Sequence, residues 1–318
     1  MLAKVNTLFL SGIDSEVIEV ETDLARGLPS FNVVGLGGTA IKEAGERVRS
    51  AAVNSGFDYP RCRITVNLVP AGRRKEGSHF DLPIAIGILS ACGAVPGRAL
   101  GGFGIIGELS LDGRVNGVRG ALSMIMGAAG SGLKKMIVPA KNAGEAGMAE
   151  GIDIYPVNDL RETVEFLTGG KDIPIYNRKK KDHRIFCAAE DFADVTGQET
   201  AKRAMIICAA GAHGLLMMGS PGSGKTMMAR RLPGILPSMT HEERLDVARI
   251  YSVAGMLDQN DPEEMSRPFR SPHHSITVPA LIGGGRRPMP GELSLAHCGV
   301  LFTKRIINDD IRATIRCL

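Results

Sequence analysis

The chain has 318 residues, enough for two domains that each bury a core of their own. Its composition, 44% hydrophobic and 23% charged, is that of an ordinary globular protein, and its formal net charge of +4 is too small by itself to indicate a polyanionic partner. The low aromatic content, 4% with no tryptophan, argues against an aromatic platform that stacks single-stranded nucleic acid.

Cysteine spacing and hydropathy exclude further classes of protein. The six cysteines are scattered without a C-x-x-C pair, so they indicate neither a zinc site nor a disulfide framework. The longest apolar stretch, residues 83–95, is too short to span a bilayer, and the N-terminus has only one lysine and a short apolar patch. We expect a cytoplasmic protein with reduced thiols and no membrane partner.

The first half of the chain alternates strand-like and helix-like segments. Residues 15–24 and 63–70 have the alternation or β-branched enrichment of strands, and residues 39–56 carry apolar side chains at helical spacing before a glycine. Residues 134–146 repeat the theme as a short strand and a helix start. This mixture predicts an α/β domain. The apolar positions of the predicted helix are Ile41, Ala44, Val48, Ala51 and Ala52.

A basic segment follows the first domain. Residues 169–184 contain six basic residues against two acidic ones, together with two glycines and a proline. This composition predicts a linker over residues 169–188. The linker is either a solvated hinge or a basic arm that contacts phosphate groups.

The second domain is expected to begin with a helix and a short strand. Asp194 or Thr196 is positioned to cap a helix that ends at Gly211 or Gly214. Residues 215–218, LLMM, then form a short apolar strand. The apolar face predicted for the helix consists of Ala201, Ala204, Met205 and Cys208.

A glycine-rich octet directly after that strand, GSPGSGKT, fits the phosphate-binding pattern G-x-x-x-x-G-K-[ST] at every fixed position. Its glycines let the backbone N–H groups face the phosphates, Lys225 bridges the β- and γ-phosphates, and Thr226 holds Mg²⁺. The strand before it and the helical MMARRL after it favour nucleotide binding over a chance glycine-rich turn. The predicted nucleotide-binding residues are Gly219, Ser220, Pro221, Gly222, Ser223, Gly224, Lys225 and Thr226.

Several long stretches, taken together, resemble the Mg-chelatase-like AAA+ ATPases, specifically the ComM/YifB group. Residues 195–237, 267–285 and 290–302 are similar to the ATPase domain of that group. Residues 27–57 and 63–89 are similar to its Lon-protease-like domain. The resemblance runs nearly continuously from residue 1 to residue 302. It implies an α+β Lon-like domain, residues 1–168, followed by an incomplete parallel-sheet P-loop AAA+ domain, residues 189–302.

The resemblance also implies an activity and partners. Members of the group form hexameric rings that use ATP and Mg²⁺ to drive DNA remodelling, similar to branch migration in natural transformation. A hairpin inserted in the ATPase domain faces the pore, so Arg286 and Arg287 are candidates for DNA contact, with two solvated arginines as the alternative. His273 and His274 match a family signature, but adjacent histidines are poorly placed to chelate one metal ion.

A Lon-type peptidase site needs a serine nucleophile and a lysine that takes its proton. In the comparable stretch of this chain the nucleophile position falls on His79, with Ser78 one place early. The lysine position falls on Leu122. We therefore expect a domain without peptidase activity that packs against the ring, helps assembly or contacts nucleic acid.

The end of the second ATPase strand departs from the family pattern. Hydrolysis needs an Asp to hold Mg²⁺ and a Glu to activate water there, and family members continue GVLF with L-D-E. This chain continues residues 299–302 with T-K-R, so no catalytic residue is assigned. Asp309 and Asp310 can serve only if the strand is shifted along the chain. We expect residues 303–318 to be a tail outside the family pattern, as if the reading frame had changed.

The sequence thus predicts an ATP-binding fragment of a ComM-like motor that does not hydrolyse ATP. Sensor residues, an arginine finger and the helical lid of the family are expected to be missing, so ring formation by this chain is doubtful. Alternatives are an interaction module that docks onto rings of a full-length copy, a nonfunctional remnant, or an Mg-chelatase-type ATPase of a tetrapyrrole system. The fused Lon-like domain argues against the last.

Overall fold

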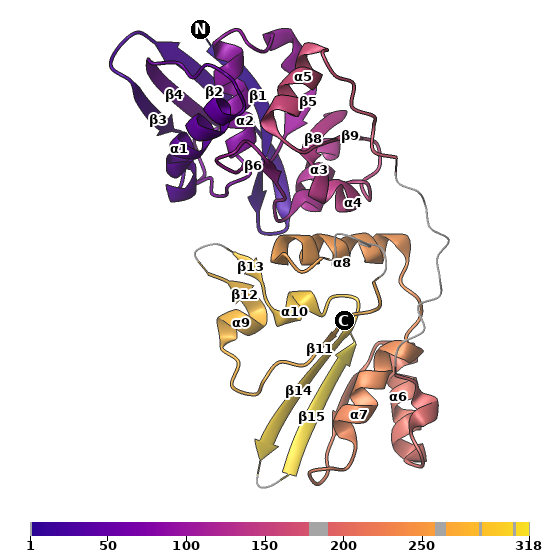
Figure 1. The fold of residues 1–318 in the computed structure, drawn as a ribbon. Helices are drawn as coiled ribbons and strands as arrows, with labels where there is room; N and C mark the ends of the chain where they lie inside the picture. Colours follow the sequence, from indigo (N-terminus) through magenta and orange to yellow (C-terminus); the bar gives the residue numbers. More distant parts are fainter. Residues whose placement is uncertain (1, 178–189, 258–264, 286–287, 308–309, 318) are drawn as a thin grey trace. The chain divides into compact units, whose positions relative to one another are not determined.

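The chain forms two compact units, residues 1–179 and 180–318, in a computed structural model (Figure 1). The predicted α/β class is confirmed, because both units combine helices with a sheet that contains parallel strand pairs. No helix among the described residues is long and apolar enough to cross a membrane. The residues that the structure describes are 2–177, 190–257, 265–285, 288–307 and 310–317.

The first unit is built on a seven-stranded sheet of order β3-β4-β2-β1-β5-β8-β9. Strand β2 is antiparallel to both β1 and β4, whereas β3 is parallel to β4, and β5, β8 and β9 extend the sheet in parallel from β1. The predicted strands over residues 15–24 and 63–70 are β2 and β4. The strands are β1 (Leu2–Ser11), β2 (Asp14–Ala25), β3 (Ser30–Val34), β4 (Arg63–Val69), β5 (Phe103–Ile105), β8 (Lys135–Pro139) and β9 (Asp153–Val157).

Helix α1 (Thr39–Asn54) packs against the sheet and against helix α2 through the apolar face that its sequence predicts. The five positions expected on that face are all buried. Their spacing of three and four residues puts them on one side of the helix, so the polar side chains between them face solvent. The residue-level prediction for this helix is therefore confirmed.

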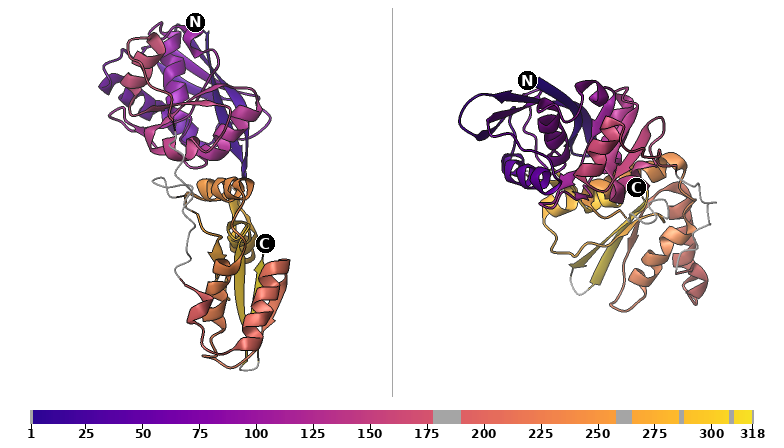
Figure 2. Two further views of the ribbon diagram at one scale, coloured as in Figure 1. Left: turned by 90° about the vertical axis from the view of Figure 1, so that its right-hand side faces the viewer. Right: turned by 45° about the horizontal axis from the view of Figure 1, so that its top comes forward.

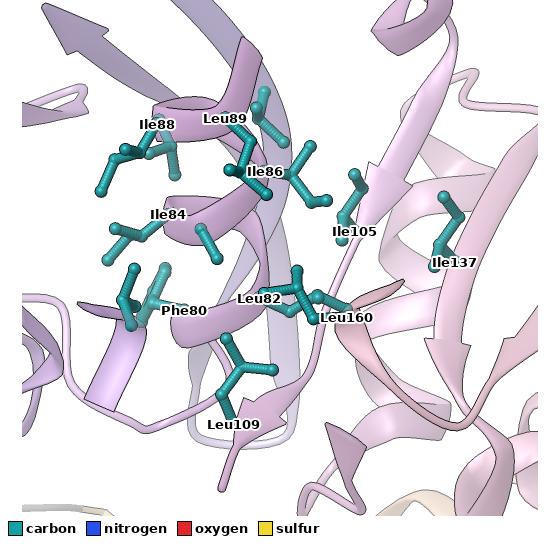
Figure 3. Close-up of a cluster of buried hydrophobic side chains, with 14 of the residues drawn as sticks. Phe80, Leu82, Ile84, Ile86, Ile88, Leu89, Ile105, Leu109, Ile137 and Leu160 are labelled. Atoms are coloured by element: carbon teal, nitrogen blue, oxygen red, sulfur yellow. The ribbon is translucent and has the colours of Figure 1, made fainter. Parts of the chain in front are cut away.

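Helix α2 (Asp81–Ala91) is buried along its whole length and packs on β1 and β2. A helix that is apolar all round belongs inside a domain, which is why no polar face was visible in its sequence. Figure 3 shows Leu82 and Ile86 on the side of α2 that faces Ile105 of β5. At its first turn, Asp81 is bound by the guanidinium of Arg47 from α1, with N–O distances of 2.8 and 3.0 Å.

The remaining elements of the first unit connect this core. The N-cap Asp159 accepts a hydrogen bond of 2.8 Å from the backbone N–H of Glu162, and Gly169 ends the same helix, α5, with a φ of 79°. These elements are β6 (Glu108–Leu109), β7 (Val115–Asn116), α3 (Ala121–Gly130), α4 (Ala143–Ala146), α5 (Leu160–Thr168) and 3₁₀ turns at Gly97–Leu100 and Ala140–Asn142.

The second unit is built on a four-stranded sheet of order β10-β15-β14-β11. Strand β15 is antiparallel to both β10 and β14, so β10 and β14 run in the same direction, and β11 is parallel to β14. The carboxyl ends of β10 and β14 therefore point toward the same edge of the sheet. The four strands are β10 (Gly214–Met217), β11 (Phe269–Arg270), β14 (Val300–Ile307) and β15 (Asp310–Cys317).

Helices α6 and α7 lie alongside the β14–β15 hairpin (Figure 2) and form one core with it. The sheet contributes Phe302, which is fully buried, and its ring lies 6.1 Å from that of Phe269 on β11. The helices contribute Met205 from α6 and Met228 from α7. The other elements of the unit are α6 (Glu199–Gly211), α7 (Lys225–Arg231), α8 (His241–Ala254), α9 (Val278–Ile282), β12 (Gly283–Gly284), β13 (Met289–Pro290), α10 (Glu292–Leu295) and 3₁₀ turns at Phe192–Asp194 and Leu232–Ile235.

Two boundaries in the second unit differ from the prediction. Helix α6 is preceded by Gln198 with a φ of 58°, not capped by Asp194 or Thr196. Asp194 instead accepts from the backbone N–H of Asp191 in a 3₁₀ turn, so its carboxylate is already used. The strand expected to end at Phe302 continues to Ile307, because β15 offers it a hydrogen-bonded partner along its whole length.

His79 supplies a pH-dependent test of the first unit. The side chain is buried beside α2, its Nε2 lies 3.0 Å from the carbonyl oxygen of Leu8, and burial lowers its pKa to about 4. The unfolded chain therefore binds more protons than the folded chain between about pH 6.5 and pH 4. We predict that this residue makes the free energy of unfolding fall by up to about 3 kcal/mol as the pH drops through that window.

The measurement is urea unfolding of the full chain, followed by circular dichroism at a series of pH values. The variant His79→Gln keeps an N–H donor for Leu8 but has no titrating ring. Its unfolding free energy should lose this part of the pH dependence. An equal slope in both proteins would show that His79 is not held neutral.

Candidate nucleotide-binding site

The predicted phosphate loop connects β10 to α7. Gly222 and Gly224 have φ values of 81° and 85°, where residues with a Cβ are strained. A Cβ on Gly219 would lie 3.3 Å from the hydroxyl oxygen of Ser223, which is tighter than an ordinary contact. The curled backbone thus requires the small residues that the pattern places there, and Ser220 to Ser223 are exposed to an incoming ligand.

Lys225 is the charged centre of the loop. Its ammonium donates to the carbonyl oxygens of Gly219 at 2.7 Å and Ser220 at 2.8 Å, and to the hydroxyl of Ser223 at 2.9 Å. The lysine is buried, and all three partners are uncharged oxygens. Phosphate oxygens carry the negative charge that these partners lack, so a nucleotide makes stronger hydrogen bonds to this ammonium. The loop therefore fits a nucleoside triphosphate.

The sheet pairing places the tip of the second ATPase strand beside this loop. Lys304 on β14 pairs with Ala313 on β15, which in turn pairs with Met217, two residues before Gly219. Neighbouring strands are about 4.8 Å apart, so the backbones of Lys304 and Met217 are separated by about 10 Å. The strand position where the family needs its metal-binding carboxylate therefore lies in the same row as the end of β10.

The side chain of Lys304 lies on the helix-covered face of the sheet. Alternate residues of a strand point to the same face, and Phe302 is buried in the core with α6 and α7. Consistent with this, the ammonium of Lys304 lies 5.5 Å from the centre of the Phe302 ring. Thr303, the residue between them, is on the opposite face of the sheet. A cation therefore occupies the strand position at which the family pattern has a carboxylate.

The backbone of Asp310 lies at the far end of the β14–β15 ladder. It pairs with Ile307, three residues beyond Lys304 and about 10 Å farther along the strand. Asp309 lies outside the described residues. The strand is not shifted, because residues 305–307 belong to the same strand as Phe302, and a role of Asp310 in the site stays a prediction.

A magnesium site is only half present. Thr226, half-buried in the first turn of α7, supplies a hydroxyl, but the facing strand supplies an ammonium instead of an oxygen ligand. Within the described parts of the chain, no group of three or more His, Cys, Asp or Glu side chains is placed to hold a metal ion. The rings of His273 and His274 lie 4.0 Å apart, and Nδ1 of His273 lies 2.7 Å from the hydroxyl of Ser275.

The hairpin expected to carry DNA-contacting arginines is present as strands β12 and β13. Gly283 pairs with Pro290 and Gly284 with Met289 in a short antiparallel ladder. Arg286 and Arg287 lie between these strands in sequence but outside the described residues, so their role stays a prediction.

The first unit holds no serine–lysine pair among the residues that the structure describes near Ser78. The Ser78 hydroxyl donates to the carboxylate of Glu108, and Leu122 is fully buried. Lys75, which no sequence motif singles out, is buried and donates to the carbonyl oxygens of Leu68 at 3.3 Å and of Pro70. Burial lowers the pKa of Lys75, and its hydrogen-bond partners are backbone carbonyl oxygens, not Ser78. The absence of peptidase activity stays a prediction that this geometry supports.

Comparisons with known proteins agree with the division of the chain. Residues 191–313 match the family described as magnesium chelatase, subunit ChlI, and residues 20–142 match the family described as subunit ChlI of Mg-chelatase. Competence protein ComM of Haemophilus influenzae is 43% identical over 92% of this chain. The protein YifB of Escherichia coli is 43% identical over 95% of it. The chain belongs to the ComM/YifB-like family of Mg-chelatase-type AAA+ proteins.

Two further facts qualify this family membership. The chain spans 57% of the length of the Haemophilus protein and 59% of the Escherichia protein. A Lon protease of Mycolicibacterium smegmatis is 24% identical over 49% of this chain and 21% of its own length. This ComM/YifB-like chain is therefore also similar, in part, to Lon proteins.

The contacts of Lys225 predict a change in the dynamics of the loop. Replacing Lys225 with Met removes the ammonium that connects three loop oxygens, so backbone amides of residues 219–224 should exchange hydrogen about tenfold faster. Hydrogen exchange with mass spectrometry measures this without nucleotide. Arg230→Met, at an exposed position of the same helix, is the control. Unchanged exchange in the Lys225 variant would mean that the lysine does not hold the loop.

Proposed function

We propose that this chain binds ATP at residues 219–226 and does not hydrolyse it, as part of a ComM-like AAA+ protein. The observation that carries the proposal has two parts. Lys225 is held within a glycine-rich phosphate loop, and Lys304, not a carboxylate, lies across β15 from the strand that leads into that loop. Binding and hydrolysis are separable because they use different groups. The loop supplies the donors that bind phosphate, whereas the end of β14 has a lysine where hydrolysis needs a carboxylate.

Binding follows from the chemistry of the loop. Backbone N–H groups of the curled segment and the ammonium of Lys225 donate to phosphate oxygens, which take over from the carbonyls of Gly219 and Ser220. The positive φ angles of Gly222 and Gly224 give the loop the curled backbone that directs its N–H groups toward the β- and γ-phosphates.

Hydrolysis requires a group that orients or deprotonates the attacking water. A carboxylate can accept that proton, whereas the protonated amine of Lys304 cannot. The positions beside the end of β10 on β14 and β15 are Thr303, Lys304, Ala313 and Thr314. None of these side chains is a general base, so bound ATP stays intact.

The wider activity of the family extends this proposal. The name of the Haemophilus relative associates it with competence, and we propose that this chain acts in cytoplasmic DNA remodelling with related subunits. Identity of 43% with ComM and with YifB, over 92% and 95% of this chain, favours this role over that of a magnesium chelatase subunit. DNA as partner, and assembly into a ring or docking onto full-length copies, are further parts of the proposal.

Binding and turnover of ATP by the full chain test the proposal together. Titration with a fluorescent ATP analogue should give saturable binding that weakens at least tenfold in Lys225→Ala, because the ammonium no longer meets the phosphates. Phosphate release should stay at the level of the buffer. Steady turnover that disappears in Lys225→Ala would refute the proposal, since it would require a catalytic base that this account excludes.

A further inference from the structure

The exchange of a carboxylate for a lysine at the end of β14 affects which form of the nucleotide fits. In P-loop proteins Mg²⁺ neutralises the β- and γ-phosphates and is itself held by a hydroxyl and a carboxylate. Here the hydroxyl of Thr226 is present, but Lys304 stands at the position on β14 where the family pattern has the carboxylate. A divalent cation at that place is repelled by the ammonium and lacks one of its usual anchors.

We propose that this site takes ATP as the metal-free anion, with the ammonium of Lys304 in the place of Mg²⁺. The inference rests on the proposed function, since it concerns the same phosphate loop. It changes the ligand from a magnesium–nucleotide complex to the free nucleoside triphosphate. Lys304 thereby becomes a residue that determines specificity, without any role in a chemical step.

The placement of Lys304 supports this role. Its backbone lies in the row of Met217, about 10 Å away across β15, and its side chain lies on the face covered by α6 and α7. The phosphate loop begins two residues after Met217 and continues into α7 on that same face. The long, flexible stem of a lysine lets its ammonium bridge much of that gap toward a bound triphosphate.

The charges around the site point to an anionic ligand. The hydrogen-bond partners of Lys225 are uncharged oxygens, and the ammonium of Lys304 lies over the ring of Phe302. Among the carboxylates whose side chains the structure describes, none forms an ion pair with either lysine. Two cations without an acidic partner there leave charge that a free triphosphate, with its four negative charges, compensates better than its magnesium complex does.

The alternative is that Lys304 covers the Phe302 ring and never meets a ligand. Its half-buried side chain and the cation–π distance of 5.5 Å are compatible with that purely structural role. The two interpretations differ in what magnesium does. If Lys304 replaces the metal, removing magnesium leaves ATP binding intact or strengthens it. If Lys304 is only structural, ATP binds as its magnesium complex, and removing magnesium weakens binding.

The test is isothermal titration of the full chain with ATP, once in excess Mg²⁺ and once in EDTA. We expect the wild-type chain to bind at least as tightly in EDTA as in Mg²⁺. Lys304→Asp should reverse this order, with at least tenfold weaker binding in EDTA and recovery in Mg²⁺. Lys304→Arg keeps the charge and should keep the wild-type behaviour.

Controls separate the possible outcomes. Lys202→Met removes a lysine of α6 that pairs with Glu199 and should leave both titrations unchanged. Circular dichroism of each variant shows whether the fold is retained, and the Arg variant supplies a conservative replacement. Binding that requires Mg²⁺ in the wild type and is unaffected by Lys304→Asp overturns this inference but leaves ATP binding in place. No binding under either condition overturns the proposed function itself.

Discussion

Strand β15 hydrogen-bonds to β14 on one side and to β10 on the other, and the candidate site depends on this pairing. It makes β10 and β14 run in the same direction with one strand between them. The end of β10, from which the phosphate loop continues, and Lys304 consequently lie in the same row of the sheet, about 10 Å apart across β15. The burial of Ile315 and Phe302 under α6 and α7 stabilises the arrangement, because a one-residue slip would expose both side chains.

The first unit is a scaffold built around one buried helix. The apolar helix α2 is enclosed by α1 and the sheet, and the Arg47–Asp81 ion pair connects the two helices. Ser78, Lys75 and His79 lie close together in sequence, yet each is engaged by a different partner. In the described part of this unit, neither Ser78 nor Lys75 hydrogen-bonds to the other, which supports the prediction that the unit lacks peptidase activity.

Local patterns predicted the parts of the chain whose structure depends on local spacing. The apolar positions of α1, the strands β2 and β4 and the segment from β10 to α7 follow from periodicity and glycine placement. The position of β15 could not be predicted, because strand pairing is decided by partners almost one hundred residues apart in the chain. The prediction that Asp194 caps helix α6 was wrong because its carboxylate accepts a hydrogen bond from the backbone N–H of Asp191 in a neighbouring 3₁₀ turn.

The account requires the terminal phosphate of ATP to lie between Lys225 and Lys304. An ATP derivative with an activated acyl group on its terminal phosphate transfers that group to nearby lysines, and peptide mass spectrometry locates it. In EDTA, we expect acylation of both Lys225 and Lys304, suppressed by excess ATP. Acylation of Lys225 alone, or acylation that ATP does not suppress, would contradict the account.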